Sequence, residues 1–463
     1  MDFTTQRILL GAAGGAEPDT YFYAYISNLN QNEGLNNIAI DDTNGDVFLS
    51  WRSNVGTGTY SSYDAHDIAQ IDKEGSKVTI VKNTHTPNSS NGGRGVAIKS
   101  NGHAVALSRG GGRYGVTTIN MGSPSVVSQV FPAPSSNYRS VEANQIFEHS
   151  NNIYLCGRWA YSSSRGANIV KLNSSNTIQW SAYLNTSYGY TSYFTQGDNG
   201  DIAIIGTNSG GSTSMYVAKI NSSGSFVCGA LIQHVGDNEA DVAIDSNGDI
   251  IAITAGSKYA GYRAGILCKF NGSNGNLIWS REINKFNTNF FRFAIDVGAD
   301  GTIHIICMEN YSNGYFRYMR INSSGTKTYD RRISTTFSNL VFNAKLVAKN
   351  KNIYIGLSSN YSSRAVFVLK LPDSGDITGS YNQVSITNTG SFFAVQSVGS
   401  DYAQTGTSTP TFQSYNWTVS NYTSNTQVYL TSSTSVSYPQ TNSVTSSGYP
   451  LSHYNYSDYT LPL

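Results

Sequence analysis

Asp245, Asn247 and Asp249 are spaced two residues apart around Gly248 in the stretch DSNGDIIAI. Oxygen ligands at alternate positions beside a glycine are typical of the start of a calcium-binding loop. The spacing does not match an EF-hand calcium loop, however. If Gly248 takes the sixth loop position, Ala243 takes the first, where an acidic ligand is needed. The same residues suit a two-residue hairpin turn, since Asn and Gly tolerate a positive φ. The sequence favours the turn, with loosely bound surface calcium as the alternative.

Carboxylates for acid–base chemistry are the second candidate group. Asp41, Asp245 and Asp296 each follow an Ala-Ile pair, and two facing carboxylates can cleave a glycosidic bond. The sequence contains no H-E-x-x-H, G-x-S-x-G or P-loop motif, and its seven histidines are scattered. Residues that recur at one position of a repeat are normally framework. We therefore expect no catalytic residues, no cofactor and no enzyme activity; the alternative is a glycosidase or lyase acting on surface polysaccharide.

Composition disfavours several classes of partner. Only 13% of the 463 residues are charged and the net charge is +1, so we expect neither nucleic acid nor an anionic membrane surface as a partner. No apolar run approaches the roughly 18 residues of a membrane-spanning helix, and the N-terminal apolar run is too short for a signal peptide. The four cysteines lie tens of residues apart without a C-x-x-C pair, which indicates buried thiols rather than a zinc site.

The elements that must position these residues are repeated. Seven copies of the turn motif recur at spacings of 48 to 57 residues, and they align on Gly45, Gly102, Asn152, Gly200, Gly248, Gly301 and Asn352. A second motif with the same period begins at Lys171, Lys219, Lys269, Arg320 and Lys370, with weaker copies at Gln70 and Thr118. Two motifs sharing one period of about fifty residues indicate propeller blades. We therefore predict an all-β, seven-bladed β-propeller with four strands per blade.

The second motif carries an aromatic position. Trp180, Cys228, Trp279 and Tyr329 each follow the turn of their copy by four residues. This spacing resembles the tryptophan-docking repeats of quinoprotein-type and related bacterial propellers, in which the Trp packs between neighbouring blades. The resemblance covers roughly residues 21–382 and implies a fold, not an activity. It also implies that Cys228 is a packing residue rather than a nucleophile or ligand.

The loops between the second and third strands are the candidate binding surface. Because both turn motifs project from one face of the ring, these longer loops are expected on the opposite face, and they are rich in Tyr, Ser, Gly and Arg. Such a mixture is typical of recognition surfaces, and aromatic residues with Arg also suit sugar rings. Repeated Tyr and Arg pairs can instead pack between blades. We expect ligand binding by the non-repeating residues Tyr60, Tyr63, Arg113, Tyr114 and Trp159.

The two ends of the chain differ from the repeats. We divide the chain into an N-terminal arm (residues 1–20), the propeller (21–382) and a β-rich extension (383–463) that contains no Lys, Arg or Glu. The extension has little core of its own, so we expect it to dock on the propeller, on a like chain or on a larger assembly.

The N-terminal stretch TTQRILLGAAGGA, Thr4 to Ala16, is similar to the opening of many structural and tail-fibre proteins of marine bacteriophages, especially cyanophages. Lectin-like sandwich domains normally follow there, whereas this chain continues with the repeats. The resemblance implies a non-enzymatic virion protein of a tail, fibre or capsid whose arm docks on the particle. Its expected partners are other virion proteins and a host surface glycan, without nucleic acid or membrane insertion, in an oligomeric or larger assembly released by lysis. A secreted bacterial lectin is a further alternative.

Overall fold

The computed structural model describes the strands and the short turns that join them. The described residues are 2–8, 21–26, 35–54, 64–75, 78–84, 93–110, 113–123, 125–134, 140–161, 164–185, 192–207, 214–233, 240–259, 262–286, 293–310, 315–335, 344–358, 366–374, 379–381, 384–387, 394–397, 403–404, 411–414, 417–420, 430–432 and 452–455. None of these residues lies in a helix, and hence none in a helix that could span a membrane.

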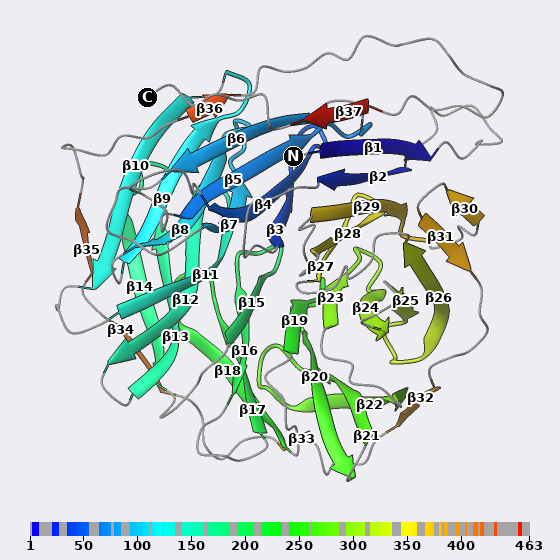
Figure 1. Cartoon of the computed structure of the whole chain (residues 1–463). Coiled ribbons are helices and arrows are strands. Elements are labelled where there is room, and N and C mark those ends of the chain that lie inside the picture. The colour runs from blue at the N-terminus through cyan, green and yellow to red at the C-terminus, as the bar shows by residue number, and fades with distance from the viewer. Residues whose placement is uncertain are drawn as a thin grey trace, which may run out of the picture.

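Seven four-stranded antiparallel blades form a ring, which confirms the predicted seven-bladed propeller (Figure 1). The innermost strands are β3 (Leu35–Ile40), β7 (Gly93–Ile98), β11 (Ser140–His149), β15 (Ser192–Gln196), β19 (Ala240–Ile244), β23 (Phe293–Val297) and β27 (Lys345–Lys349). The second strands are β4 (Val47–Asn54), β8 (Ala104–Gly110), β12 (Asn152–Tyr161), β16 (Ile202–Thr207), β20 (Ile250–Tyr259), β24 (Ile303–Asn310) and β28 (Asn352–Ser358). We number the blades 1 to 7 in this order.

The two outer layers complete each blade. The third strands are β5 (Asp64–Ile71), β9 (Arg113–Asn120), β13 (Ser164–Leu172), β17 (Ser214–Ile220), β21 (Tyr262–Phe270), β25 (Tyr315–Ile321) and β29 (Val366–Pro372). The fourth strands are β6 (Val78–Thr84), β10 (Ser125–Pro134), β14 (Ile178–Asn185), β18 (Phe226–Gln233), β22 (Leu277–Phe286), β26 (Lys327–Thr335) and, in blade 7, β2 (Tyr21–Ile26). Blade 7 thus combines a strand from near the N-terminus with three strands from much later in the chain, which closes the ring.

The turn motif joins the first two strands of each blade, but its geometry differs from the two-residue turn that we expected in blade 5. The Gly248 amide donates to the Asp245 carbonyl at 2.8 Å, and the Asp245 amide donates to the Asp249 carbonyl at 3.0 Å. Gly248 has φ of 79° and Asn247 has no positive φ. This is a type I turn followed by a left-handed glycine, a three-residue loop.

Two-residue turns occur instead in blades 3 and 7, where the motif has no glycine. Ser150 and Asn151 both have positive φ, as do Asn350 and Lys351, which is the pattern of a type I′ turn. The strands on either side pair directly, with His149 opposite Asn152 and Lys349 opposite the residue that follows Lys351. In these two blades the left-handed residues therefore precede the positions, Asn152 and Asn352, that we aligned with glycine.

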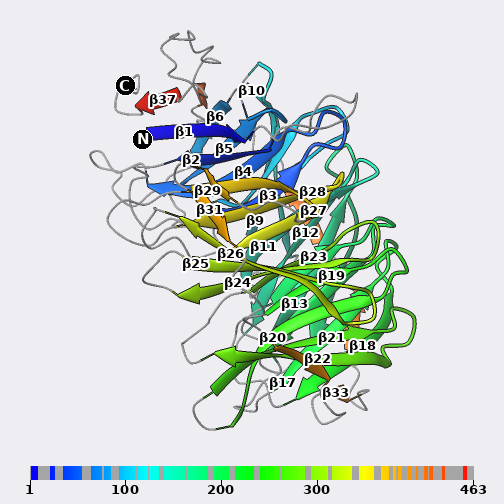
Figure 2. The ribbon, with the colours of Figure 1, turned by 90° about the vertical axis from the view of Figure 1, so that its right-hand side faces the viewer.

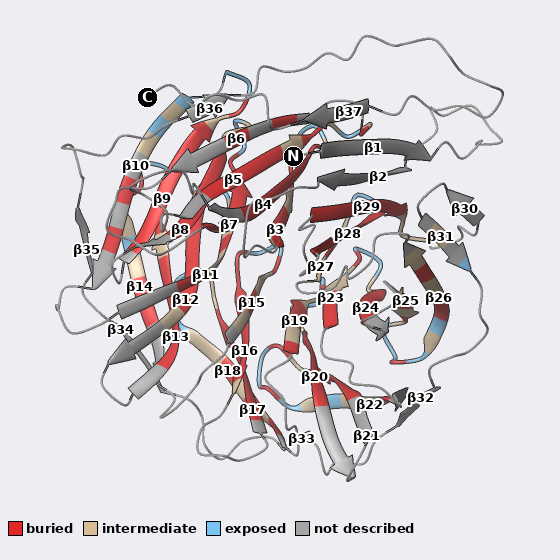
Figure 3. Ribbon diagram, in the orientation of Figure 1, coloured by how far each residue is buried: buried red, intermediate tan, exposed pale blue. Residues whose placement is uncertain are grey.

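The hydrophobic core consists of clusters that join the facing sides of neighbouring blades. Leu49 of blade 1 packs in one cluster with Val368 of blade 7, and Val105 of blade 2 packs in another with Leu155 of blade 3. The inner three strands of the blades carry most of the buried residues (Figure 3). Burial on both sides of each blade explains why many strands read as continuous apolar runs rather than alternating ones.

Residues 2–8 form a strand of blade 7 rather than a free arm. This strand, β1 (Asp2–Ile8), pairs antiparallel with β2 on one side. On its other side it pairs with the last strand of the chain, β37 (Ser452–Asn455). The first and the last described strands therefore lie side by side on the outside of the closing blade (Figure 2).

The C-terminal extension runs around the outside of the propeller and adds a strand to every blade. After the short strand β30 (Gly379–Tyr381), its strands are β31 (Val384–Thr387), β32 (Ala394–Ser397), β33 (Ala403–Gln404), β34 (Thr411–Ser414), β35 (Trp417–Ser420), β36 (Leu430–Ser432) and β37. In this order they pair antiparallel with the outer strands of blades 6, 5, 4, 3, 2, 1 and 7. We call β31 to β37 the belt. It follows the periphery of the ring (Figure 1), so of the three expected docking partners the extension pairs with the propeller.

Candidate functional site

The turn that opened the sequence analysis is held by its own carboxylates. Asp245 Oδ1 accepts the amides of Asn247 and Asp249, each at 2.9 Å. Lys269 Nζ lies 2.7 Å from Asp245 Oδ2 and 3.3 Å from Asp249 Oδ2. The Lys269 ammonium group thus lies between the two carboxylates, where a bound cation would compete with it. Among the described residues, no group of three or more His, Cys, Asp or Glu side chains is arranged to hold a metal ion.

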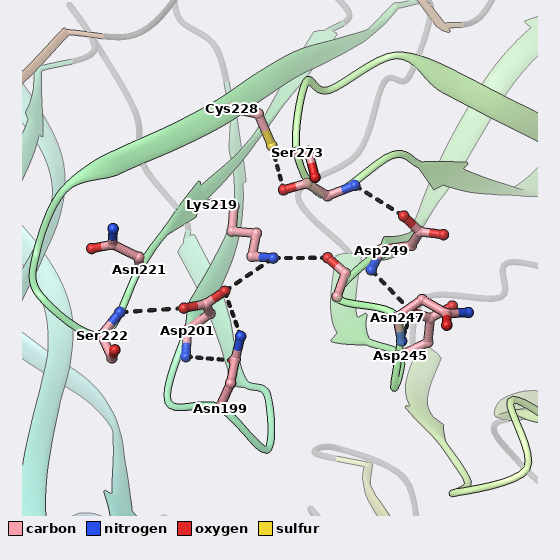
Figure 4. Close-up of polar contacts among 12 residues, drawn as sticks. Asn199, Asp201, Lys219, Asn221, Ser222, Cys228, Asp245, Asn247, Asp249 and Ser273 are labelled. Carbon is pink, nitrogen blue, oxygen red and sulfur yellow. Dashed lines mark hydrogen bonds and ion pairs between the residues drawn. The ribbon is translucent and has the colours of Figure 1, made fainter.

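Four of the cations that begin the second motif bond to the next blade. Lys219 Nζ pairs with Asp201 Oδ2 of its own blade at 3.0 Å and donates to the Gly248 carbonyl of blade 5 at 2.9 Å (Figure 4). Equivalent bonds to a turn carbonyl of the next blade come from Lys171 to Ser222 at 3.0 Å, from Lys370 to Lys73 at 3.0 Å, and from Arg320 to Ser374. The bond from Lys370 closes the ring from blade 7 to blade 1. Sequence analysis found this recurring position but assigned it no role.

The aromatic position of the second motif packs between blades, as the resemblance implied. The Trp180 indole donates to the Ser222 carbonyl of blade 4 at 3.2 Å, and the Trp279 indole donates to the Ser323 carbonyl of blade 6 at 3.0 Å. Cys228 occupies the same position, with its thiol 3.5 Å from the Gly272 carbonyl of blade 5. It is 4% exposed, and burial raises its pKa, which argues against a nucleophile. The packing interpretation of Cys228 is confirmed.

The central channel is a cavity of about 750 Å³ lined by all seven innermost strands. Side chains on its wall bond to the backbone of the following blade. The Asn37 amide donates to the Val96 carbonyl at 3.1 Å, and Gln145 Oε1 accepts the Phe194 amide at 2.7 Å. A cavity of this volume is typical of small-ligand sites, so the channel is the candidate binding site that the described residues form.

Two carboxylates of the channel wall have unusual acidities. Asp241 Oδ2 accepts the Ile295 amide at 3.0 Å, and Asp296 Oδ2 accepts the Ala348 amide at 2.8 Å. Burial raises the pKa of Asp241 to about 6. Burial also raises the pKa of Asp296 to about 7, and the neighbouring Asp241 carboxylate adds to the rise. Carboxylic acids that titrate near neutral pH in a cavity are candidates for proton transfer, although here each also bonds two backbone amides.

The three carboxylates proposed from sequence do not share one position. Asp41 and Asp245 lie in turns on the short-turn face, where both side chains are buried and bond to turn amides. Asp296 lies within β23 and lines the channel. Sequence analysis missed Asp241, which lacks the preceding Ala-Ile pair. The signal available was its position in β19, where blades 1 and 3 carry the polar residues Asn37 and Gln145 at the corresponding point of the innermost strand.

The residues predicted to bind a ligand on the loop face do not form one described site. Tyr60 and Tyr63 lie outside the described residues. Arg113 begins β9 and Trp159 lies in β12, and their side chains are also outside the described part.

Tyr114 corrects the prediction. Its side chain is 0% exposed and its hydroxyl donates to Asn168 Oδ1 of blade 3 at 2.9 Å. Burial raises its pKa well above the usual value. A side chain enclosed between blades 2 and 3 cannot present its ring to a ligand, so Tyr114 is a packing residue. Its Tyr-Gly sequence after a glycine-rich loop resembled a recognition loop, because the first residues of β9 could not be distinguished from the loop.

Comparisons with known proteins extend to the fold alone. No family model and no curated protein matches the chain. The structure of the Dos1 propeller has a TM-score of 0.46 and 5% identity, covering 74% of this chain and 93% of that one. A protein of unknown function from Dyadobacter fermentans DSM 18053 has a TM-score of 0.40 and 10% identity, covering 80% and 99%. A protein from Lactobacillus plantarum has a TM-score of 0.43 and 10% identity, covering 74% and 99%. These likenesses carry no argument about function.

Proposed function

We propose that this chain is a non-enzymatic structural protein of a bacteriophage virion, carried on a tail, fibre or capsid, that presents its loop face to a host glycan or to another virion protein. The observation that carries this proposal is the belt, because with it the outermost strand of each blade is only two to four residues long. Unpaired strand edges invite edge-to-edge aggregation, and very short edge strands limit it. A ring with such short edges suits a protein that is packed at high local concentration in a particle.

The similarity of Thr4–Ala16 to cyanophage virion proteins supports a location on a phage particle. The Tyr-rich loops support a role in binding. Because β1 is held between β2 and β37, residues 2–8 are part of the propeller. Docking by the N-terminal region therefore falls to residues 9–20, which lie outside the described residues.

The location is tested by imaging phage particles that carry an epitope tag in this chain. We expect labelled density on the tail, fibre or capsid of purified particles. Particles that contain none of the protein would contradict the proposal.

The binding face is tested separately with the double variant Tyr60→Ala/Tyr63→Ala. Host-cell or partner binding should fall by at least tenfold while the melting temperature stays nearly unchanged, since one lost aromatic anchor costs about 1–2 kcal/mol of binding free energy. Tyr114→Phe is the matched control, because it changes a buried tyrosine and should leave binding intact. Equal losses in both variants would favour a packing role for these loops.

A polysaccharide-cleaving enzyme is the second candidate, and the acidities of Asp241 and Asp296 in the channel favour it. Turnover of host polysaccharide that is abolished by Asp241→Asn or Asp296→Asn would establish the enzyme and overturn the binding proposal. Equal stability of the variants, measured by urea unfolding, is the required control, since both carboxylates also bond the next blade.

A further inference from the structure

The belt holds the propeller through main-chain pairing of very short strands. Each belt strand contributes two to four residues to its blade, as for β33 with two and β37 with four. In β37 the pairing joins Asp2 with Asn455 and Thr5 with Ser452 at its two ends. Main-chain recognition of an added strand depends little on side chains. The same edge on any copy of the chain therefore accepts the same strand.

The steps between successive belt strands differ greatly in length. The first five connections are residues 388–393, 398–402, 405–410, 415–416 and 421–429, and each leads to the neighbouring blade. The sixth is residues 433–451, which also leads only to the neighbouring blade, from β36 on blade 1 to β37 on blade 7. Nineteen residues reach roughly 60 Å when extended, whereas six residues reach roughly 20 Å. The last connection is thus more than twice as long as any earlier one, and it leads to a strand that lies one position farther out in its sheet, beyond β1.

We propose that β37 is an exchangeable strand that pairs with β1 of a second copy of this chain. Exchange preserves every bond, because donor and acceptor are identical in each copy, and swapping an identical element is a low-cost route to association. The sixth connection supplies the reach, and β1 supplies an acceptor edge on the outside of the closing blade. This proposal does not depend on the virion role.

Concentration decides between the two arrangements. Because β37 and β1 belong to one chain, β37 meets its own β1 at an effective concentration that is typically in the millimolar range for linked segments. In dilute solution the strand therefore pairs within its own chain, as in this structure. Where copies are crowded to comparable local concentrations, the strand of a neighbour competes equally. The partner surface is then the β1 edge, and the result is a linear or closed series of joined propellers.

Single-cysteine variants of the full chain test the exchange. Thr4 lies opposite His453 in the register of β1 and β37, and opposed Cα atoms in antiparallel strands are about 4.5–5.5 Å apart, which suits a disulfide. Mixing a Thr4→Cys copy with a differently tagged His453→Cys copy should give a covalent dimer of one copy each. The yield should rise with protein concentration. The four native cysteines are buried, so they contribute little background.

Two controls make the result decisive. Thr4→Cys mixed with Gln396→Cys should give no specific dimer, because Gln396 pairs with Glu282 of blade 5. Shortening residues 433–451 to six residues should remove the mixed dimer, while the double variant Thr4→Cys/His453→Cys still forms a bridge within one chain. The proposal is overturned if the double variant bridges only within one chain at every concentration up to the millimolar range. It is equally overturned if no bridge forms at all.

Discussion

At the scale of single residues, charged and polar side chains stabilise the ring by bonding across seams between blades. Lys219 lies between Asp201 of its own blade and a turn carbonyl of the next. The pair is nearly buried, with side-chain exposures of 7% and 11%. Removing one member would leave the other charge buried without its partner, which costs more than the pair itself contributes. The repeated Lys position is therefore framework, although its residue type first suggests a binding surface.

His304 predicts a pH dependence of stability. Its side chain is 1% exposed, Nδ1 lies 2.7 Å from the Tyr318 hydroxyl, and burial lowers its pKa from 6.5 to about 4. Between these two values the unfolded chain binds more protons than the folded one, so the free energy of unfolding falls as pH decreases, by up to about 3 kcal/mol. We therefore expect the free energy of unfolding of the parent protein, relative to that of His304→Gln, to fall between pH 7.5 and pH 4.5, as measured by urea unfolding.

The comparison of the two proteins isolates His304. Asp241 and Asp296 act in the opposite direction, since their raised pKa values make stability fall as pH rises from about 4 to about 7. Both proteins retain these carboxylates, so their effect cancels in the difference. A difference between the proteins that stays constant with pH would contradict the assignment.

At the scale of elements, the packing of each outer strand against the next blade depends on the aromatic position of the second motif. Trp279 of β22 donates to Ser323 of blade 6 and stacks beneath Arg281, whose guanidinium lies 5.2 Å from the ring centroid. Because the ring is only half-buried, we expect Trp279→Ala to lower the free energy of unfolding by about 2 kcal/mol. The neighbouring Ile278 is 48% exposed, so Ile278→Ala should change it by less than about 0.5 kcal/mol. Urea unfolding of Trp279→Ala and Ile278→Ala measures the difference between their free energies of unfolding.

Disruption of the first strand, β1, should destabilise the propeller, which the sequence alone did not predict. We expected residues 1–20 to be an arm separate from the propeller, but β1 pairs on both sides, with β2 and β37. Thr5→Pro removes one ladder bond and should lower the free energy of unfolding by about 3 kcal/mol. Thr5→Val keeps the backbone amide and should have little effect. Equal thermal unfolding of the two variants would show that β1 does not contribute to the closing blade.

At the scale of the whole molecule, the belt replaces long strands at the outer edge of the ring by edge strands of only two to four residues. A chain ended after residue 382 loses every belt strand and exposes the outer strands of seven sheets. We expect such a chain to self-associate at micromolar concentration, because exposed edges pair with one another. A chain ended after residue 432 loses only β37 among the belt strands and exposes the outer strand of one sheet, so it should self-associate much less. Light scattering at matched concentrations distinguishes the two, and a monodisperse short chain would refute edge protection by the belt.

The sequence by itself determined the repeat, the number of blades, the four strands of each and the face that carries the short turns. These features depend on local chemistry: glycine or asparagine at left-handed turn positions, and apolar strands between them. The docking role of Cys228 followed in the same way, because one position of the repeat was filled by Trp, Cys, Trp and Tyr. A repeated local pattern needs no knowledge of distant contacts.

Only the tertiary structure decided which side chains meet across a seam. The contact of Tyr114 with Asn168, the channel position of Asp241 beside Asp296, and the bond from Lys171 to Ser222 each join residues about fifty positions apart. The course of the belt is more distant still, since β37 pairs with a strand more than four hundred residues earlier. Main-chain pairing of short uncharged strands leaves no signature in side-chain chemistry. Partners of this kind are chosen by which edges the folded ring leaves open.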